Sequence, residues 1–533
     1  MCIRDREHNA WSPDGGNPPE HTTVIPFTRG LAGPMDFTFG TFNFTNEAYP
    51  GTRVNTTLCK QLALFVVIYS PLQMASDLPE NYKEIKAFDF IKDVPTDWDK
   101  TYVVDAKIGD YSVFARKDRN SSDWYVGCIT DENARELDIP LSFLETEAKY
   151  IAQIYADGDD AEWKTNPTSF KYEEKTVTAS DTLHVKLATS GGCAIRFITT
   201  MRKMTQRLFP QQASFFDFRL LNDTSTDSFT IKSEGNKIII SGNNANSMAV
   251  GLNHYLKNYC LTTISWYKDD PIELPKTLPN IPAEVTIKAN VPTRFFLNYC
   301  TFGYSMTWWK WSDWEHFIDW MALNGINMPL AITGQEAIWY KVWSKLGLTD
   351  EEIRGYFTGP AHLPWHRMRN LDGWQSPLPK EWLSSQAELQ EQIVAREREF
   401  NMQPVLPAFA GHVPAALKRV YPNIKTSRVS EWGGFADQYR CTFLNPMDSL
   451  YAIIQKEYLT EQTRLYGTNH IYGIDPFNEI DPPSWDTDSL GMMAKHIYES
   501  VAAVDPKAIW LQMTWLFYAD IKHWTTPRIK SYL

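Results

Sequence analysis

The chain lacks the cysteine patterns that mark a metal site or a disulfide framework. Its seven cysteines are scattered over 533 residues, with no Cys-x-x-Cys pair and no cysteine–histidine cluster at ligand spacing. This excludes a recognisable structural zinc site and a predictable set of disulfides. No apolar run approaches the length of a membrane span, and residues 1–6 contain no apolar core of a signal peptide. We therefore expect no membrane partner.

Positive charge is also scarce. The chain has 52 Lys and Arg against 64 Asp and Glu, a net charge of −12. Nucleic acids attract basic surfaces, so a nucleic-acid partner is not expected either. Aromatic residues, in contrast, are abundant, with 20 Trp, 25 Tyr and 28 Phe. Most such rings pack in cores, but they also form the stacking faces of carbohydrate sites. The composition therefore leans toward sugars as ligands.

The first part of the chain divides into two segments with different patterns. Residues 7–93 open with a long polar stretch rich in Pro and Gly, and an apolar helix is predicted over residues 61–74. Residues 94–197 carry short segments of alternating polarity separated by turns, which predicts a β-sandwich.

Residues 199–290 are typical of a small α/β unit. Two β-branched segments flank the turn at residues 234–236, which predicts a hairpin, and an amphipathic helix is predicted over residues 245–259. At 533 residues the whole chain is long enough for two or three domains.

From residue 291 onward, strands and helices alternate. This pattern predicts a parallel sheet, and its length favours a TIM barrel. About five strands are recognisable where a closed (β/α)8 barrel has eight, so we expect an incomplete barrel. The predicted strands are residues 295–300, 327–332, 404–409, 470–479 and 509–515, and the predicted helices are residues 313–324, 335–346, 386–400, 451–465 and 489–504.

Glu479 is the leading candidate for a catalytic residue. It follows Asn478 at the end of an apolar strand, and residues at the carboxyl ends of barrel strands line the active site. Glycoside hydrolysis uses a pair of carboxyl groups. We interpret Glu479 as a general acid/base and Asn478 as an amide that holds a sugar hydroxyl. The alternative is a glutamate at a helix N-terminus, stabilised by the helix dipole.

Asn298 and Cys300 alternate along the first predicted barrel strand, with Tyr304 just beyond its end. Alternate residues of a strand share a face, so both side chains are expected to face the pocket. No histidine stands nearby in the sequence to activate a thiol, and buried cysteines usually act as small hydrophobes. Cys300 is therefore interpreted as a pocket-lining residue and not as a nucleophile.

Three tryptophans are candidates for stacking on a sugar ring. Trp365 and Trp432 lie in predicted loops after strands, and Trp515 ends the last predicted strand. Packing beneath a long loop is the alternative for each of them. His412, in the segment Gly-His-Val-Pro at residues 411–414, lacks the glycine spacing and lysine of a phosphate loop. It is interpreted as a loop histidine bonded to backbone.

These residues carry a resemblance to a known family. Residues 199–533 resemble the α-N-acetylglucosaminidases of glycoside hydrolase family 89. The resemblance rests on residues 298–301, 308–311, 319–327, 334–339, 357–361, 406–414 and 477–479. It implies a retaining hydrolase that needs no cofactor, with an N-terminal α/β domain at residues 199–290 and a truncated TIM barrel at residues 291–533. The implied substrate is a glycan with terminal α-linked N-acetylglucosamine.

The same resemblance implies roles for individual residues. Glu479 matches the position of the family's acid/base. The residues that match its sugar pocket are Asn298, Cys300, Tyr304, Trp365, Trp432, Asn478 and Trp515. The family's nucleophile is a glutamate of a later barrel strand, whose position falls beyond Leu533. We therefore expect this fragment to be inactive.

Residues 7–197 resemble a different family, the C-terminal part of glycoside hydrolase family 97, of α-glucosidase or α-galactosidase type. The resemblance rests on residues 14–23, 26–29, 31–38 and 105–111. It implies that residues 7–93 end a catalytic barrel and that residues 94–197 form a C-terminal β-sandwich. Glu20, and with it Glu7, resembles a carboxylate of that family's calcium site, so calcium is a possible cofactor for this part.

Residues 1–6 resemble neither family and are interpreted as a non-native leader. The simplest account of the whole is two carbohydrate-degradation genes read in one frame. The parent enzymes are expected to be secreted or periplasmic. Two alternative functions remain open: a carbohydrate-binding fragment without catalysis, and a remnant of a calcium-dependent family 97 α-glucosidase.

Overall fold

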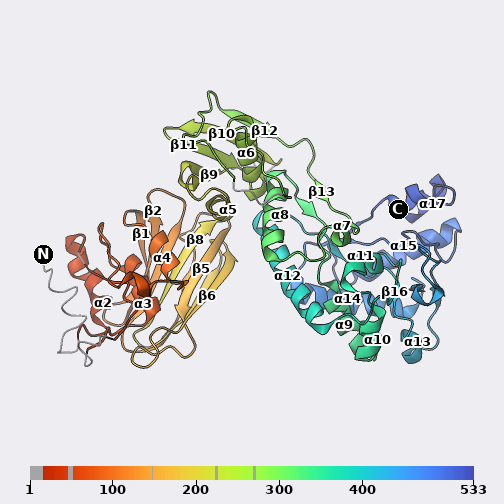
Figure 1. Ribbon diagram of the computed structural model, residues 1–533, viewed down its shortest axis with the longest axis horizontal. Coiled ribbons are helices and arrows are strands. Elements are labelled where there is room, and N and C mark those ends of the chain that lie inside the picture. Colours follow the sequence, from red (N-terminus) through yellow and green to blue (C-terminus); the bar gives the residue numbers. More distant parts are fainter. Residues whose placement is uncertain (1–15, 36, 46–51, 147, 222–225, 268–271) are drawn as a thin grey trace. The chain divides into compact units, whose positions relative to one another are not determined.

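The computed structural model describes residues 16–35, 37–45, 52–146, 148–221, 226–267 and 272–533. The chain forms two compact units (Figure 1). The first comprises Met1–Asn222, Thr230–Gly242 and Ile272–Thr286, and the second comprises Asp223–Phe229, Asn243–Pro271 and Ile287–Leu533. No helix in the described parts of the chain is both long enough and apolar enough to cross a bilayer.

The first unit opens with a mainly helical segment. Its elements are α2 (His21–Val24), η1 (Ile25–Phe27), η2 (Arg29–Ala32), α3 (Leu58–Val67), η3 (Pro79–Asn81) and α4 (Phe88–Asp93). Helix α3 is the helix predicted over residues 61–74, but it begins earlier and ends earlier. Thr57 caps its start by accepting a hydrogen bond from the Lys60 amide at 3.2 Å. It ends before Ser70-Pro71, because proline disfavours helical backbone in the residue before it.

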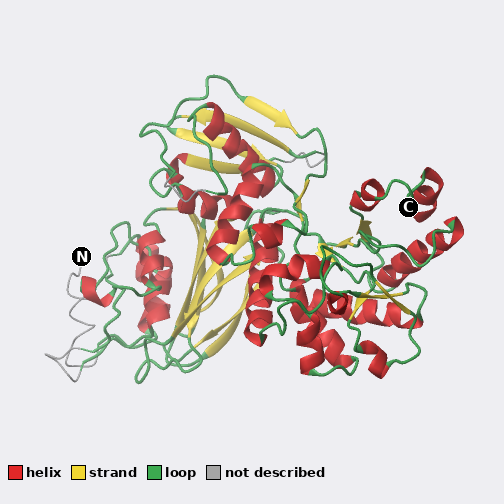
Figure 2. Cartoon of the chain, turned by 45° about the vertical axis from the view of Figure 1, so that its right-hand side comes forward, coloured by secondary structure: helices red, strands yellow, loops and turns green. Residues whose placement is uncertain are grey.

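An antiparallel six-stranded sheet follows, in the order β1-β2-β3-β8-β5-β6, together with a two-stranded sheet, β4-β7. Figure 2 shows these strands. Their bounds are β1 (Trp98–Lys107), β2 (Tyr111–Asp118), β3 (Trp124–Thr130), β4 (Arg135–Pro140), β5 (Tyr150–Asp157), β6 (Phe170–Val177), β7 (Thr182–Leu187) and β8 (Gly192–Thr199). The expected sheet-rich character of this region is confirmed.

Both faces of the central strands of the six-stranded sheet are buried, whereas the edge strands β1 and β6 are largely exposed. On one face, residues such as Trp124, Val126 and Phe197 pack with Leu183 of the β4-β7 sheet. On the other face, Tyr125 and its neighbours pack against α3. Every residue of α3 is buried, as is every residue of β3. The alternation of buried and exposed residues expected for this region therefore does not extend to β3, which is covered on both faces.

A four-stranded sheet has the order β12-β10-β11-β9. The helix before it and its strands are α5 (Thr200–Leu208), β9 (Phe216–Leu220), β10 (Ser228–Glu234), β11 (Lys237–Gly242) and β12 (Val285–Lys288). The predicted hairpin is present, and Gly235 at its turn has φ +60°, which glycine adopts without steric cost. The predicted helix at residues 245–259 is α6 (Ala245–Asn258), capped by Asn244, which accepts from the Ser247 amide at 2.8 Å.

The second unit is built on five short parallel strands that follow one another in chain order. They are β13 (Phe295–Phe296), β14 (Met328–Pro329), β15 (Leu406–Pro407), β19 (Ile471–Gly473) and β20 (Ile509–Leu511). A parallel bridge between Leu330 and Val405 joins the second strand to the third. The predicted alternation and parallel pairing are confirmed, and the strands that the structure describes form no closed barrel.

Helices cover the outside of these strands (Figure 1). Neighbouring helices pack in the order α6, α8, α12, α14, α15 and α17, and α9 packs against both α12 and α14. Their bounds, with those of the shorter helices, are α7 (Thr301–Tyr304), α8 (Trp311–Leu323), α9 (Gln335–Lys345), α10 (Asp350–Tyr356), η5 (Pro360–His362), α11 (Leu363–Arg367), α12 (Lys380–Glu399), α13 (Leu417–Val420), η6 (Asp437–Tyr439), α14 (Ser449–Tyr466), α15 (Thr487–Ala502), α16 (Trp515–Ala519) and α17 (Thr526–Tyr532). A separate antiparallel sheet, β16 (His412–Val413), β18 (Thr442–Leu444) and β17 (Thr426–Arg428), is inserted between β15 and β19.

All five predicted barrel strands are longer than the observed strands, and two of the differences bear on the site. The strand expected at residues 295–300 ends at Phe296, because Leu297 takes a left-handed conformation, φ +80°. Asn298 Oδ1 then accepts from the Thr301 amide at 3.2 Å and starts α7, so Asn298 and Cys300 do not share the face of a strand. The strand expected at residues 509–515 ends at Leu511, and Trp515 opens α16.

We predict that Gly127→Ala destabilises the first unit. A Cβ at this position would lie 2.6 Å from the Ala63 carbonyl oxygen of α3, which is backbone and cannot move aside cheaply. Overpacking of this kind costs about 1–3 kcal/mol. Lys175→Ala, at an exposed position of β6, should change stability by less than about 0.5 kcal/mol. Urea unfolding followed by circular dichroism measures both, and equal stability of the two variants would contradict the packing described.

Candidate active site

A cavity of about 420 Å³ lies at the carboxyl ends of the five parallel strands. This volume is in the range of small-molecule sites, roughly 300–1,000 Å³. Each strand contributes the residues that follow it, as expected for a barrel-type site. The residues of the wall that matter below are Asn298, Tyr299, Cys300, Glu336, Trp365, His366, Arg367, Arg369, Asn370, His412, Trp432, Asp475, Asn478, Glu479, Met513 and Trp515.

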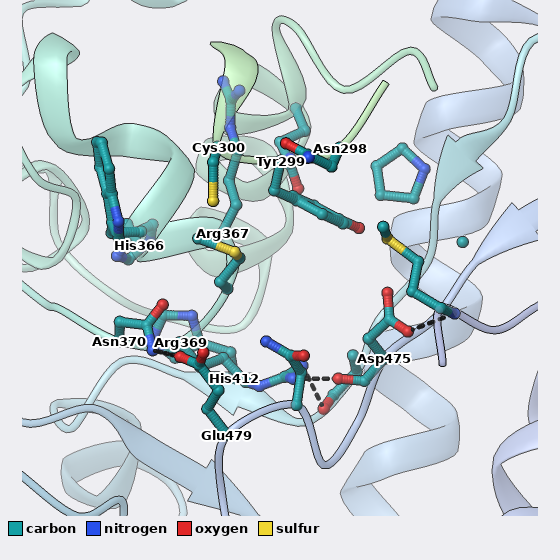
Figure 3. A pocket seen from close by; sticks show the side chains of 18 of the residues that line it. Asn298, Tyr299, Cys300, His366, Arg367, Arg369, Asn370, His412, Asp475 and Glu479 are labelled. Carbon is teal, nitrogen blue, oxygen red and sulfur yellow. Dashed lines mark hydrogen bonds between the residues drawn. The ribbon is translucent and has the colours of Figure 1, made fainter. Parts of the chain in front are cut away.

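Glu479 lies six residues past the end of β19, in a turn. Its Oε2 accepts a hydrogen bond from Asn370 Nδ2 at 3.0 Å (Figure 3). Its Oε1 accepts one from Trp515 Nε1 at 3.1 Å. Its backbone has φ +55°, a conformation that costs a non-glycine residue about 1–3 kcal/mol. The next helix, α15, begins only at Thr487. The alternative of a helix N-terminal glutamate is therefore wrong.

Most of the predicted site residues surround this carboxylate. Asn298, Cys300, Trp365, Trp432, Asn478 and Trp515 line the same cavity as Glu479. Tyr304 does not line it: its side chain is 76% exposed and meets Trp365 edge to face, with ring centroids 5.3 Å apart. Burial raises the pKa of the Cys300 thiol, and Glu479 raises it further. The thiol stays protonated, which fits a lining role and not that of a nucleophile.

A buried ion pair in the wall was missed from the sequence. Glu336 is 2% exposed and accepts from Arg367 Nε and Nη2, both at 2.8 Å. The sequence did contain a cue for Glu336. This residue stands in the first turn of α9, the helix that follows strand β14, and residues that follow barrel strands line the active site. Its charge is matched by Arg367, so the pair builds the wall.

Asp475 is a second carboxyl group that the sequence reasoning passed over, although it lies in the segment between β19 and Glu479. Its Oδ1 accepts from the Met513 amide at 2.9 Å and from Gln512 Nε2. Burial raises the pKa of Asp475 to about 6. Arg369, 3% exposed, donates to the Asp475 carbonyl oxygen and lies beside the cavity. Neither residue forms a motif of its own in the sequence.

His412 is not satisfied by backbone, as was expected, but by a carboxylate. Its Nε2 lies 2.7 Å from Asp372 Oδ1, which His366 Nδ1 also approaches, at 3.1 Å. Cys441 donates to the same oxygen at 3.2 Å. Burial alone would raise the pKa of Asp372, but the two imidazoles hold it below its ordinary value. The sequence could not show this contact because the residues come from separate segments.

Two groups of side chains in the described residues could hold a metal ion. One is His366, Asp372 and His412, and the other is Asp481, Asp520 and His523. Glu20 belongs to neither. It precedes α2 in the first unit, where its carbonyl accepts from Thr23 Oγ1 at 2.7 Å. A calcium role for Glu20 stays a prediction, and Glu7 lies outside the described residues.

Different parts of the chain match different protein families. Residues 294–533 match the TIM-barrel domain of α-N-acetylglucosaminidase, and residues 199–280 match its N-terminal domain. Residues 97–198 match the C-terminal domain of glycoside hydrolase family 97, described as an oligomerisation domain. Both resemblances are confirmed. The second unit and the residues leading to it are α-N-acetylglucosaminidase-like, and the sheet of the first unit is family 97-like.

Individual relatives agree with this division. Human α-N-acetylglucosaminidase is 40% identical over 357 residues, covering 65% of this chain and 48% of the human protein. A retaining α-galactosidase of Bacteroides thetaiotaomicron is 36% identical over 200 residues, covering 36% of this chain and 30% of that protein. The chain thus spans about half the length of the first relative and about a third of the second.

A solved structure shares the fold. A family 89 glycoside hydrolase from Clostridium perfringens, in complex with its substrate GlcNAc-α-1,4-galactose, has a TM-score of 0.58 and 23% identity. The match covers 79% of this chain and 54% of that one. At this identity the likeness concerns the fold alone.

We predict that His412 makes stability depend on pH. Burial lowers the pKa of His412 to about 4 despite the opposing effect of Asp372. An unfolded chain takes up this proton near pH 6.5, so between pH 6.5 and 4 the unfolded state binds more protons and stability falls as pH falls. At pH 5 the loss is about 2 kcal/mol. Urea unfolding at pH 7 and pH 5 should show a smaller pH effect for His412→Gln, and parallel losses would refute the prediction.

Proposed function

We propose that the second unit carries an α-N-acetylglucosaminidase-type site that holds a terminal α-linked N-acetylglucosamine, with Glu479 as general acid/base. The observation that carries this proposal is the position of Glu479 at the cavity, with both carboxylate oxygens held by donors, Asn370 and Trp515. An orienting pair of this kind keeps the carboxyl group at one place relative to a bound glycoside. The family resemblance supplies the identity of the sugar.

In this proposal Glu479 protonates the glycosidic oxygen as the bond to the anomeric carbon breaks, and afterwards removes a proton from the attacking water. Trp365 and Trp432, whose ring centroids lie 6.5 Å apart, offer apolar faces to the sugar ring. Asn478 and Asn298 offer amides to its polar groups. The glycan would therefore be held by stacking and hydrogen bonds, and this part of the chain would need no cofactor.

Retention requires a second carboxyl group, about 5–5.5 Å from the first, that attacks the anomeric carbon. Of the two other carboxyl groups of the cavity, Glu336 has both oxygens paired with Arg367, and Asp475 is anchored through Oδ1 by Met513 and Gln512. The acetamido group of an α-linked sugar lies on the same face as the leaving oxygen and cannot attack from behind. We infer that this chain binds the sugar but turns it over negligibly.

The family 97-like sheet is proposed to have no chemistry of its own. Its described residues place their buried side chains in two cores and not around a cavity comparable to that of the second unit. Secretion or a periplasmic location, and a calcium role for Glu20, are proposals that rest on resemblance alone.

The test combines binding and turnover on the full chain. Titration calorimetry with N-acetylglucosamine should detect binding, and Glu479→Gln should keep it, because the amide preserves the shape of the pocket. Trp365→Ala should weaken it by about 10-fold, through loss of an aromatic face. Hydrolysis of an aryl α-N-acetylglucosaminide should stay at the background rate.

Two results would change the proposal. Hydrolysis that Glu479→Gln abolishes would show that a nucleophile is present in this chain after all. Absence of N-acetylglucosamine binding to the folded protein would refute the assignment of the sugar. Calcium-dependent cleavage of an aryl α-glucoside would instead favour a family 97 activity.

A further inference from the structure

The cavity has two polar ends. In Figure 3, Glu479, with Asn370 hydrogen-bonded to it, lies at the lower left of the site, and Asp475 lies to the right. Tyr299, from the turn after β13, extends toward the Asp475 end. All four residues line the cavity. The proposed function uses only the first end, which leaves the second without a role.

The carboxyl group of Asp475 is held in place from one side only. Its Oδ1 accepts from the Met513 amide and from Gln512 Nε2, and Gln512 is fixed in turn by donating to the Met513 carbonyl at 2.8 Å. No described residue donates a hydrogen bond to Oδ2. Asp475 is 9% exposed and lines the cavity. One oxygen of an anchored carboxyl group is therefore open to a ligand.

Donors accompany this acceptor. Burial raises the pKa of Tyr299, and Asp475 raises it further, so the hydroxyl keeps its proton. No described residue accepts from it. Arg369 is 3% exposed, and its Nε is buried without a hydrogen-bond partner among the described residues. Its other guanidinium contacts are the carbonyls of Asp475 and Ala410. Buried polar groups of this kind are costly unless something pairs with them.

A sugar hydroxyl pairs with both kinds of group, because it donates one hydrogen bond and accepts others. In a pyranose ring, C4 lies across from C1. If Glu479 is at the glycosidic oxygen on C1, the hydroxyls that reach the opposite end are those of C4 and its neighbour C3. This step rests on the proposed function, since it takes the position of C1 from the role of Glu479.

We infer that Asp475, with Tyr299, binds the 4-hydroxyl and an adjacent hydroxyl of the terminal sugar and is the specificity-determining carboxylate of the site. Asp475 is the acceptor and the Tyr299 hydroxyl is a donor, while Arg369 holds the backbone of Asp475 in place. A sugar whose 4-hydroxyl is axial, or is substituted by another sugar, would leave Asp475 Oδ2 unpaired. The site would then select a terminal residue with a free equatorial 4-hydroxyl.

Calorimetry on the full chain with three sugars tests this. Wild-type protein should bind N-acetylglucosamine about 10- to 100-fold more tightly than 4-deoxy-N-acetylglucosamine or N-acetylgalactosamine, since a hydrogen bond to a charged group is lost in each case. Asp475→Asn should bind N-acetylglucosamine more weakly and lose most of this preference. Trp515→Phe, at the Glu479 end, should keep the preference, whatever its effect on affinity.

The possible results distinguish a failure of this inference from a failure of the proposed function. Binding of N-acetylglucosamine without a preference over the 4-deoxy sugar would overturn the role of Asp475 and leave the proposed function standing. Failure of the folded wild-type protein to bind N-acetylglucosamine would overturn both. If Asp475→Asn does not fold, the same three sugars are compared on wild-type protein and on Tyr299→Phe. The Tyr299→Phe variant should show a smaller difference in affinity between N-acetylglucosamine and the other two sugars.

Discussion

The direction of the parallel strands is the constraint on which the second unit depends. Because β13, β14, β15, β19 and β20 all run the same way, the segments that follow them emerge at one edge of the sheet. Residues more than 200 positions apart in the chain, from Asn298 to Trp515, therefore line one cavity. The strands themselves are only two or three residues long as paired, so the helices packed outside must hold them in register.

The first unit is organised as stacked layers and not around the ends of parallel strands. Its central strands β3 and β8 are covered on both faces, by α3 on one side and by the β4-β7 sheet on the other. Among the described residues of this sheet, no concave edge is comparable to the strand ends of the second unit. Two of its glycines allow close packing, because Gly127 and Gly192 lie against the backbone of α3. The layers of this unit thus enclose two cores, and this region matches a different family from that of the second unit.

Sequence reasoning recovered what periodicity encodes and missed what depends on contacts between segments. The order of strands and helices, the hairpin at Gly235 and the site residue Glu479 followed from patterns along the chain. The carboxylate that satisfies His412 and the arginine that neutralises Glu336 come from distant segments. No local sequence pattern indicates such partners, so the prediction that His412 is hydrogen-bonded to backbone was wrong.

Left-handed backbone conformations at the cavity also bear on function. Leu297, Arg369 and Glu479 all adopt left-handed backbone conformations without being glycine, and each lies in or beside the wall of the cavity. The left-handed residue at 297 stops the first strand, which turns Asn298 and Cys300 out of alternation. At residue 479 the left-handed conformation orients the Glu479 carboxylate, which Asn370 and Trp515 hold by hydrogen bonds. Such strain persists only where surrounding contacts overdetermine it, so the places where regular patterns fail are the places where the site is built.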